Sequence, residues 1–199
     1  MDFFSAYLKI PDIVRMGLIF SNEFIMIGVI ILGLVTSKRR EVYWGTIGLN
    51  LSIIINYALK ATFKVPLMIH AGYAFPSGHM QQVTFLYGWL ALIHLFKMQY
   101  LAGFIILAQA FGQIYFKYHN GVETLSGFAV GIFLLSIFYP LYFSTLNYLA
   151  MILLGFASVL FFYILSVAAM PGYVSYAYVF FILLLLVPRF NQQSRHFIF

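Results

Sequence analysis

The sequence contains no cysteine among its 199 residues. This absence excludes a disulfide framework and any metal site built on thiolates. Charge is also scarce, because charged residues make up 8% of the chain and hydrophobic residues 63%, whereas an ordinary soluble domain carries about 25% charged residues. A surface so poor in charge would not stay soluble, so the composition predicts an integral membrane protein.

Acidic residues are the scarcest charged group, with five in the chain, and Glu123 is the only one after Glu41. Magnesium and calcium sites need several oxygen ligands, which a lone carboxylate does not supply. A zinc site formed by His79, His119 and Glu123 has a possible ligand count, but it leaves the glycine-rich setting of His79 unexplained. We therefore expect neither a metal nor another cofactor.

The net charge of +6 would suggest nucleic acid in a soluble protein. In a membrane protein, the simpler interpretation is that lysine and arginine anchor cytoplasmic loops and attract anionic lipids. We therefore expect membrane lipids as partners and no nucleic acid. The sequence does not indicate an oligomeric state.

Apolar segments are abundant, and they predict a single all-α membrane domain over residues 1–199, a polytopic helix bundle of six to seven spans at roughly 20 residues each. Residues 1–20 mix apolar and charged residues and predict a short amphipathic helix at the membrane interface. Residues 148–187 hold the C-terminal spans. The expected spans are 24–35, 43–59, 79–96, 101–116, 123–143, 148–169 and 174–187.

The charges between spans predict an orientation. With seven spans, one side of the membrane receives Lys38, Arg39, Arg40, Lys97, Arg189 and Arg195, and the positive-inside rule makes that side cytoplasmic. The second and fourth spans then end, and the third and fifth begin, at the opposite surface. Residues far apart in the sequence are therefore expected to share one pocket there.

Two polar islands lie at that surface, at 75–79 and 117–123, with Lys60 shortly before them. Ser77 is placed to cap the helix that follows, and Gly78 allows a ligand to approach the backbone, where free N–H groups form an anion site. Glu123 follows His119 by one helical turn, and an ionisable residue at the edge of a span suggests a functional site. The alternative is an exposed glutamate favoured by the helix dipole.

Together, the islands resemble the type 2 phosphatidic acid phosphatase superfamily, the membrane relatives of glucose-6-phosphatase and the vanadium haloperoxidases. One motif of that family is intact as Pro76-Ser77-Gly78-His79. The motif Ser-Arg, five residues, His, three residues, Asp is represented by Gly112-Gln113, His119 and Glu123. The motif Lys, six residues, Arg-Pro begins at Lys60 and ends at Leu67-Met68. The resemblance covers residues 43–135, which would form the catalytic core.

The resemblance implies hydrolysis or transfer of a phosphate ester through a phosphohistidine. His119 would be the nucleophile, Glu123 would orient its ring, and His79 would protonate the leaving oxygen as general acid. The phosphate-binding candidates are Lys60, Ser77, Gly78 and Gln113, with Lys64 and Lys117 as further candidates. On a continuing helix, Lys117 would share the face of Gln113, and Lys64 the face of Lys60.

Leu67 and Gln113 stand where the family has arginines, and neutral residues do not replace the bidentate guanidinium fork. The leading expectation is a metal-independent membrane phosphatase that hydrolyses a lipid phosphate or diphosphate monoester at the non-cytoplasmic face of a bacterial inner membrane, towards the periplasm. Two alternatives stay open. One is a phosphotransferase that uses the same histidine, and the other is a catalytically weak relative that binds a lipid headgroup.

Overall fold

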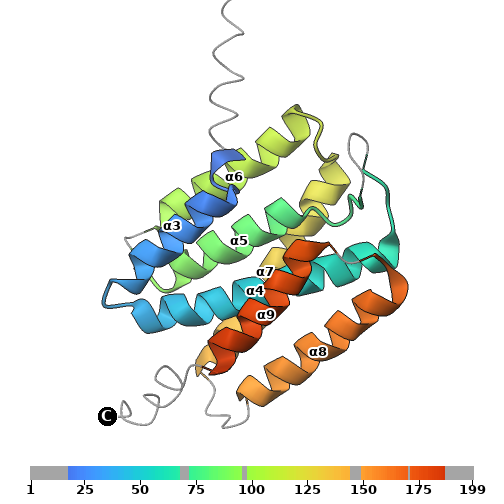
Figure 1. Cartoon of the computed structure of the whole chain (residues 1–199). Coiled ribbons are helices and arrows are strands. Elements are labelled where there is room, and N and C mark those ends of the chain that lie inside the picture. The colour runs from blue at the N-terminus through green and yellow to red at the C-terminus, as the bar shows by residue number, and fades with distance from the viewer. Residues whose placement is uncertain (1–17, 68–71, 96–97, 144–148, 170, 187–199) are drawn as a thin grey trace, which may run out of the picture.

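The computed structural model of the chain describes residues 18–67, 72–95, 98–143, 149–169 and 171–186 (Figure 1). The interfacial helix expected over 1–20 falls almost entirely outside these residues, as does the C-terminal tail. Within them the chain forms seven helices and no β-strand, so the prediction of an all-α protein is confirmed. The helices are α3 Glu23–Leu34, α4 Arg39–Phe63, α5 Gly78–Leu92, α6 Gln99–Tyr115, α7 Gly121–Phe143, α8 Leu149–Val167 and α9 Gly172–Leu186.

Each helix corresponds to one of the seven apolar segments expected from the sequence, but the helices differ in length. Among the described residues, α4, α7 and α8 are long and apolar enough to cross a membrane, with 25, 23 and 19 residues. The other helices have 12 to 17 residues. At 1.5 Å per residue, a helix of about 15 residues extends about 22 Å, less than the ~30 Å hydrocarbon core of a bilayer. Helix length and composition therefore support three candidate spans.

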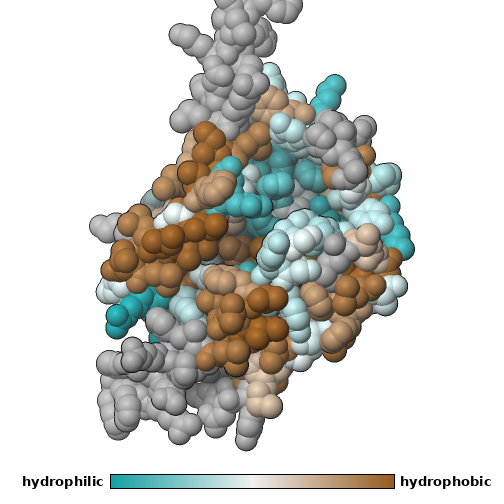
Figure 2. Space-filling model, in the orientation of Figure 1, coloured by the Kyte–Doolittle hydropathy of each residue, from teal (hydrophilic) through white to brown (hydrophobic). Residues whose placement is uncertain are grey.

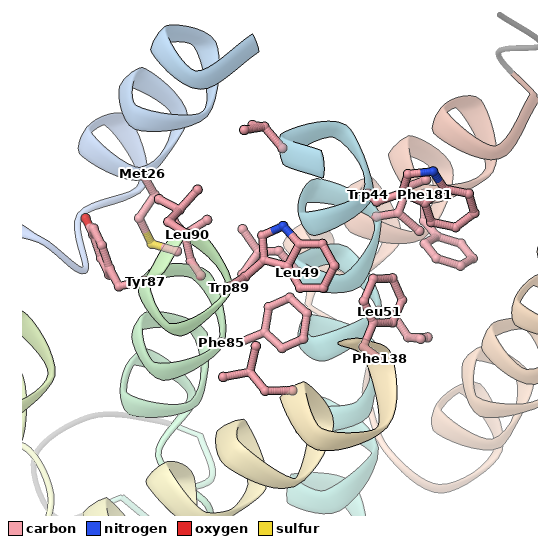
Figure 3. Close-up of a cluster of buried hydrophobic side chains, with 14 of the residues drawn as sticks. Met26, Trp44, Leu49, Leu51, Phe85, Tyr87, Trp89, Leu90, Phe138 and Phe181 are labelled. Atoms are coloured by element: carbon pink, nitrogen blue, oxygen red, sulfur yellow. The ribbon is translucent and has the colours of Figure 1, made fainter. Parts of the chain in front are cut away.

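The core of the bundle forms around α4 and α5. Helix α4 packs against α3, α5, α8 and α9, and α5 packs against α4, α6 and α7. Figure 3 shows aromatic side chains of α5 meeting Phe138 of α7 beside α4. The rings of Phe85 and Trp89 stack with centroids 6.4 Å apart, and Phe138 meets both rings edge to face. These contacts hold α5 between its neighbours.

The packing brings four helix termini to one end of the bundle, as the sequence predicts. Figure 1 shows the ends of α4 and α6 and the starts of α5 and α7 on the same side of the molecule. Two hydrogen bonds tie three of these termini together. The Ser77 N–H donates to the Glu123 carbonyl at 3.1 Å, and the Ser77 hydroxyl donates to Oε1 of Gln113 at 2.7 Å.

Glycine allows α7 to approach α5 closely at this end. A Cβ atom at Gly127 would collide with the Ser77 carbonyl oxygen, and one at Gly131 would lie 2.7 Å from Cβ of Thr84. Small residues permit such backbone approach between membrane helices. The position of the Ser77 loop relative to α7 therefore depends on the absence of a side chain at Gly127.

Candidate active site

The centre of the candidate site is a buried pair formed by His119 and Glu123. His119 follows α6, Glu123 lies in the first turn of α7, and their side chains are 7% and 6% exposed. Nδ1 of His119 lies 2.9 Å from Oε2 of Glu123. A carboxylate only accepts hydrogen bonds, so Nδ1 carries the proton of a neutral imidazole. The lone pair of Nε2 is then available to act as a nucleophile or to bind a ligand.

Asn120 fixes the Glu123 carboxylate from its other side. The Asn120 N–H donates to Oε2 of Glu123 at 3.1 Å, and its Nδ2 donates to Oε1 at 2.9 Å. In return, Oδ1 of Asn120 accepts from the Glu123 N–H at 2.9 Å. This reciprocal capping box begins α7, so Glu123 both caps its helix and holds His119. The sequence analysis did not single out Asn120, although its spacing three residues before a glutamate is the signal of a capping box.

Burial sets the charge state of His119. Desolvation is the largest influence and lowers its pKa below the usual 6.5, whereas the hydrogen bond that His119 donates to Glu123 acts in the opposite direction. The charge of Lys60 also lowers this pKa. His119 is therefore predominantly neutral at pH 7, the state in which Nε2 is nucleophilic.

Ser77 is hydrogen-bonded inside the protein, and these bonds bear on the role expected for it. Ser77 is the N-cap of α5, as the sequence predicts, and its oxygen accepts from the Met80 N–H. However, its N–H is bonded to Glu123 and its hydroxyl to Gln113. Both donors of Ser77 are therefore used inside the protein in this arrangement, and its expected role in phosphate binding stays a prediction. The N–H groups of Gly78 and His79, in the first turn of α5, lack intrahelical acceptors by helix geometry.

Lys60 and His79 complete the polar cluster. Lys60 lies in the last turn of α4 and is half-buried, and His79 is the second residue of α5 and is exposed. The charge of Lys60 acts on His79 and His119, the charge of Glu123 acts on Lys60, and the charge of His119 acts on His79. The charge of Glu23, in the first turn of α3, also reaches His79. Glu23 was not among the residues predicted for the site, and it lies far from the two islands along the chain.

The helical continuation expected for the two additional lysines is absent. Helix α6 ends at Tyr115, and Lys117 has a left-handed backbone with φ of 57°. Helix α4 ends at Phe63, and Lys64 has φ of 52°. Both lysines are exposed. The inference that they share helix faces with Gln113 and Lys60 is therefore wrong, because each helix ends before its lysine.

Leu67 lies in the loop between α4 and α5. Its N–H donates to the Gly72 carbonyl at 3.0 Å, and Pro66 pairs with Tyr73 in an isolated antiparallel bridge. The side chain of Leu67 is half-buried. Neither Leu67 nor Gln113 brings the charge of an arginine to the cluster.

A second hydrogen-bond network, formed by Asn56, Gln81 and Ser52, supports the loop at residues 76–79. Nδ2 of Asn56 donates to Oε1 of Gln81 at 2.9 Å and reaches the Pro76 carbonyl at 3.4 Å. Nε2 of Gln81 donates to the carbonyl and the hydroxyl oxygens of Ser52, each at 2.9 Å. A Cβ atom at Gly78 would lie 2.9 Å from Oδ1 of Asn56. The sequence signal for this network is weak, because it consists of single polar residues inside apolar runs.

One face of the molecule carries a hydrophilic hollow (Figure 2). Figure 2 shows hydrophilic surface gathered in a hollow between the start of α3 and the start of α9, with apolar surface around it. A groove of about 530 Å³ is lined by Leu18, Ile19, Asn22, Ile25 and Tyr118, the neighbour of His119. A second groove of about 600 Å³ lies between α5 and α7 near Leu92 and Pro140, and none of the candidate residues lines it.

Among the described residues, no group of three or more histidine and acidic side chains is arranged to hold a metal ion. The sequence was also compared with known proteins. No family model, no curated protein and no solved structure matches the chain.

Proposed function

We propose that this chain is an integral membrane enzyme of several spans that hydrolyses a lipid phosphate or diphosphate monoester through a phosphohistidine on His119. The observation that carries the proposal is the buried His119–Glu123 pair at 2.9 Å, which directs the free Nε2 away from its carboxylate partner. A nucleophile oriented by a second group, which is itself held by a third, is the arrangement of a catalytic triad. Here Asn120 is the third group.

The reaction has two steps. Nε2 of His119 attacks phosphorus, the bond to the leaving oxygen breaks, and His79 gives that oxygen a proton. Glu123 stabilises the positive charge that develops on the His119 ring. Water then attacks the phosphohistidine, returns a proton to His79 and releases phosphate. Lys60 and the N–H groups of Gly78 and His79 stabilise the phosphoryl oxygens.

The position of the site supports a lipid substrate at the non-cytoplasmic face. Lys38, Arg39 and Arg40 lie at the start of α4, whereas Lys60 lies at its other end. The positive-inside rule assigns the arginine end to the cytoplasm and the site to the opposite surface, which is the periplasm in a bacterial inner membrane. The groove that Tyr118, the neighbour of His119, helps to line also contains the aliphatic side chains of Leu18, Ile19 and Ile25, which suits a hydrocarbon chain.

A second candidate function is transfer of the phosphoryl group to an alcohol instead of water through the same phosphohistidine. A phosphohistidine passes its phosphoryl group to any hydroxyl that is held near it. The neutral residues at Leu67 and Gln113 also support a headgroup-binding protein with weak turnover, because one missing positioned donor lowers a rate by roughly 10²–10³-fold.

The test measures phosphate release by purified protein in detergent from a panel of lipid phosphates, with EDTA present. We expect release that survives EDTA and falls at least ~10³-fold in His119→Ala. His94→Ala is the matched control, since His94 is an exposed histidine beyond the other end of α5, and it should keep wild-type turnover. An added alcohol acceptor separates transfer from hydrolysis. Turnover that is equal in His119→Ala and wild type would refute the enzyme proposal.

A further inference from the structure

Hydrogen bonds join four residues of the candidate site into a closed ring. The Ser77 hydroxyl donates to Oε1 of Gln113 at 2.7 Å, and the His119 N–H donates to the Gln113 carbonyl at 3.3 Å. Nδ1 of His119 donates to Glu123 at 2.9 Å, and the Glu123 carbonyl accepts from the Ser77 N–H at 3.1 Å. The ring therefore connects the N-cap of α5, the end of α6 and the first turn of α7.

Gln113 belongs to this ring through both its side chain and its backbone. The side-chain bond reaches Ser77, the N-cap of the helix whose second residue is His79. The backbone bond reaches His119. Gln113 and Ser77 are both buried, and hydrogen bonds inside a protein are electrostatically stronger than those in water. Gln113 therefore links the segment that carries the general acid to the segment that carries the nucleophile.

The side chain of Gln113 also carries a donor that suits a different role. Its Nε2 is buried and has no hydrogen-bond partner among the described residues, which is uncommon for a buried donor. A contact with a phosphoryl oxygen, the role expected from the sequence, would act on a group that all phosphate monoesters share. The bond from Ser77 to Oε1 acts instead on the helix that carries His79. The two roles therefore differ in which substrates they affect.

We propose that Gln113 is a positioning residue that fixes the general acid His79 relative to the nucleophile His119. The inference rests on the proposed function and assigns a further role within that same site. When the N–P bond to His119 forms, the leaving oxygen takes its proton from His79, which requires a separation of about 2.6–3.2 Å. Loss of the Gln113 side-chain amide breaks the bond to Ser77 and keeps the backbone bond to His119. Proton donation is therefore weakened, while the His119–Glu123 pair is retained.

The experiment compares two phosphate monoesters that differ in their need for an acid. The dodecyl oxygen is strongly basic and leaves with a proton, whereas para-nitrophenolate is weakly basic and leaves as the anion. Gln113→Met should lower kcat/KM for dodecyl phosphate by about tenfold or more, part of the roughly 10²–10⁴-fold that general acid catalysis contributes. For para-nitrophenyl phosphate, kcat/KM should stay within about threefold of wild type, because that step needs no acid. His79→Ala should show the same selectivity with a larger loss.

Gln109→Met is the matched control for this substitution. Gln109 lies one turn before Gln113 on α6, is also buried, and its Oε1 has no hydrogen-bond partner among the described residues. This control should keep the wild-type ratio of the two substrates. Ser77→Gly breaks the same bond from its other end, and glycine is accepted as an N-cap at little cost. It should reproduce the selective loss, and it tests the inference if Gln113→Met does not fold.

The outcomes separate this inference from the proposed function. A loss confined to dodecyl phosphate in the folded variants supports the positioning role. Equal losses with both substrates in Gln113→Met overturn it in favour of a direct phosphoryl contact and leave the enzyme proposal standing. Wild-type turnover of both substrates in that variant also overturns it. No turnover of either substrate by the wild type above the His119→Ala background overturns both proposals.

Discussion

Helices α4 and α8 are both long and apolar enough to cross a membrane, but they occupy opposite environments in the bundle. In their most apolar 18-residue windows, 83% of the residues of α4 are buried and 17% of those of α8. The more apolar helix is α8, so the helix with the higher hydropathy is the exposed one. This order is the reverse of that in a soluble protein, where burial rises with hydropathy.

The reversal is the order expected of helices in a lipid bilayer, which three helices are long and apolar enough to cross. Lipid chains are as apolar as leucine, so an exposed apolar side chain gains little by turning inward, whereas a polar group in lipid lacks partners. Helix α4 accordingly buries Asn50, Ser52 and Asn56, while α8 exposes Met151, Val159 and Phe162. We expect substitutions around the buried polar groups near α4 and α5 to affect function or stability, and equivalent changes on α8 to be tolerated.

After His119→Ala, the largest effect in the buried polar region is expected for Glu123→Gln. The amide keeps the shape of the side chain but offers no second carboxylate oxygen, so His119 loses a charged partner for its developing imidazolium. Turnover should fall by on the order of 10²–10³-fold, measured by phosphate release. Tyr163→Phe, which removes the 2.9 Å contact between α8 and Thr62, is the control and should stay within about threefold. A Glu123→Gln enzyme with wild-type turnover would contradict the proposed orienting role.

The next effect concerns packing, with a matched pair of glycines. A side chain at Gly127 collides with the Ser77 carbonyl, whereas nothing lies within 4 Å of a Cβ atom at Gly155 of α8. Gly127→Val should lower the free energy of unfolding by about 1–3 kcal/mol, the cost of overpacking a close contact. Gly155→Val should change it by less than about 0.5 kcal/mol. Thermal unfolding in detergent measures both, and equal losses would mean that α7 does not pack on Ser77 as described.

A smaller effect on stability and turnover is expected from the hydrogen-bond network of Asn56 and Gln81, which supports the loop before α5. Asn56→Ala removes the hydrogen bonds to Gln81 and Pro76 and leaves Oε1 of Gln81 without that donor, at a cost of about 1–3 kcal/mol in stability. Because the network holds the loop that carries His79, kcat should fall more than KM rises. Ser158→Ala, which removes the α8–α9 contact with Tyr178, should leave kcat unchanged. An equal loss in both variants would indicate a general packing effect.

The smallest effect is a shift in the pKa of His119. Nitrogen NMR measures this titration, and His119→Ala assigns the signal. Burial lowers the pKa of His119 below 6.5, so the folded protein binds this proton less readily than the unfolded chain does. The stability contributed by neutral His119 is therefore fully present above pH 6.5 and is lost as the pH falls from 6.5 towards the lowered pKa. Glu123→Gln should lower the pKa further, because it removes the interaction that raises it. A pKa of 6.5 or above in the wild type would contradict the burial of the ring.

Much of the fold was predictable because the apolar segments are long and the polar ones short. All seven expected segments form helices, and their ends differ by a few residues from those expected. The grouping of helix termini followed from alternation across a membrane. The prediction was less accurate where helix ends decide a side chain's position, because α6 stops at Tyr115 and turns Lys117 away from the face of Gln113.

The composition and spacing by themselves determined that the protein is an all-α chain with apolar helices, and that His119 and Glu123 are one turn apart. These features are local, since they depend on hydropathy and on the helical period. Only the tertiary structure decided that Ser77 is hydrogen-bonded to Gln113 and Glu123 and that Asn56 supports the loop. Those contacts join residues that are about 20 to 50 positions apart in the chain, and helix packing alone brings their hydrogen-bonding groups together.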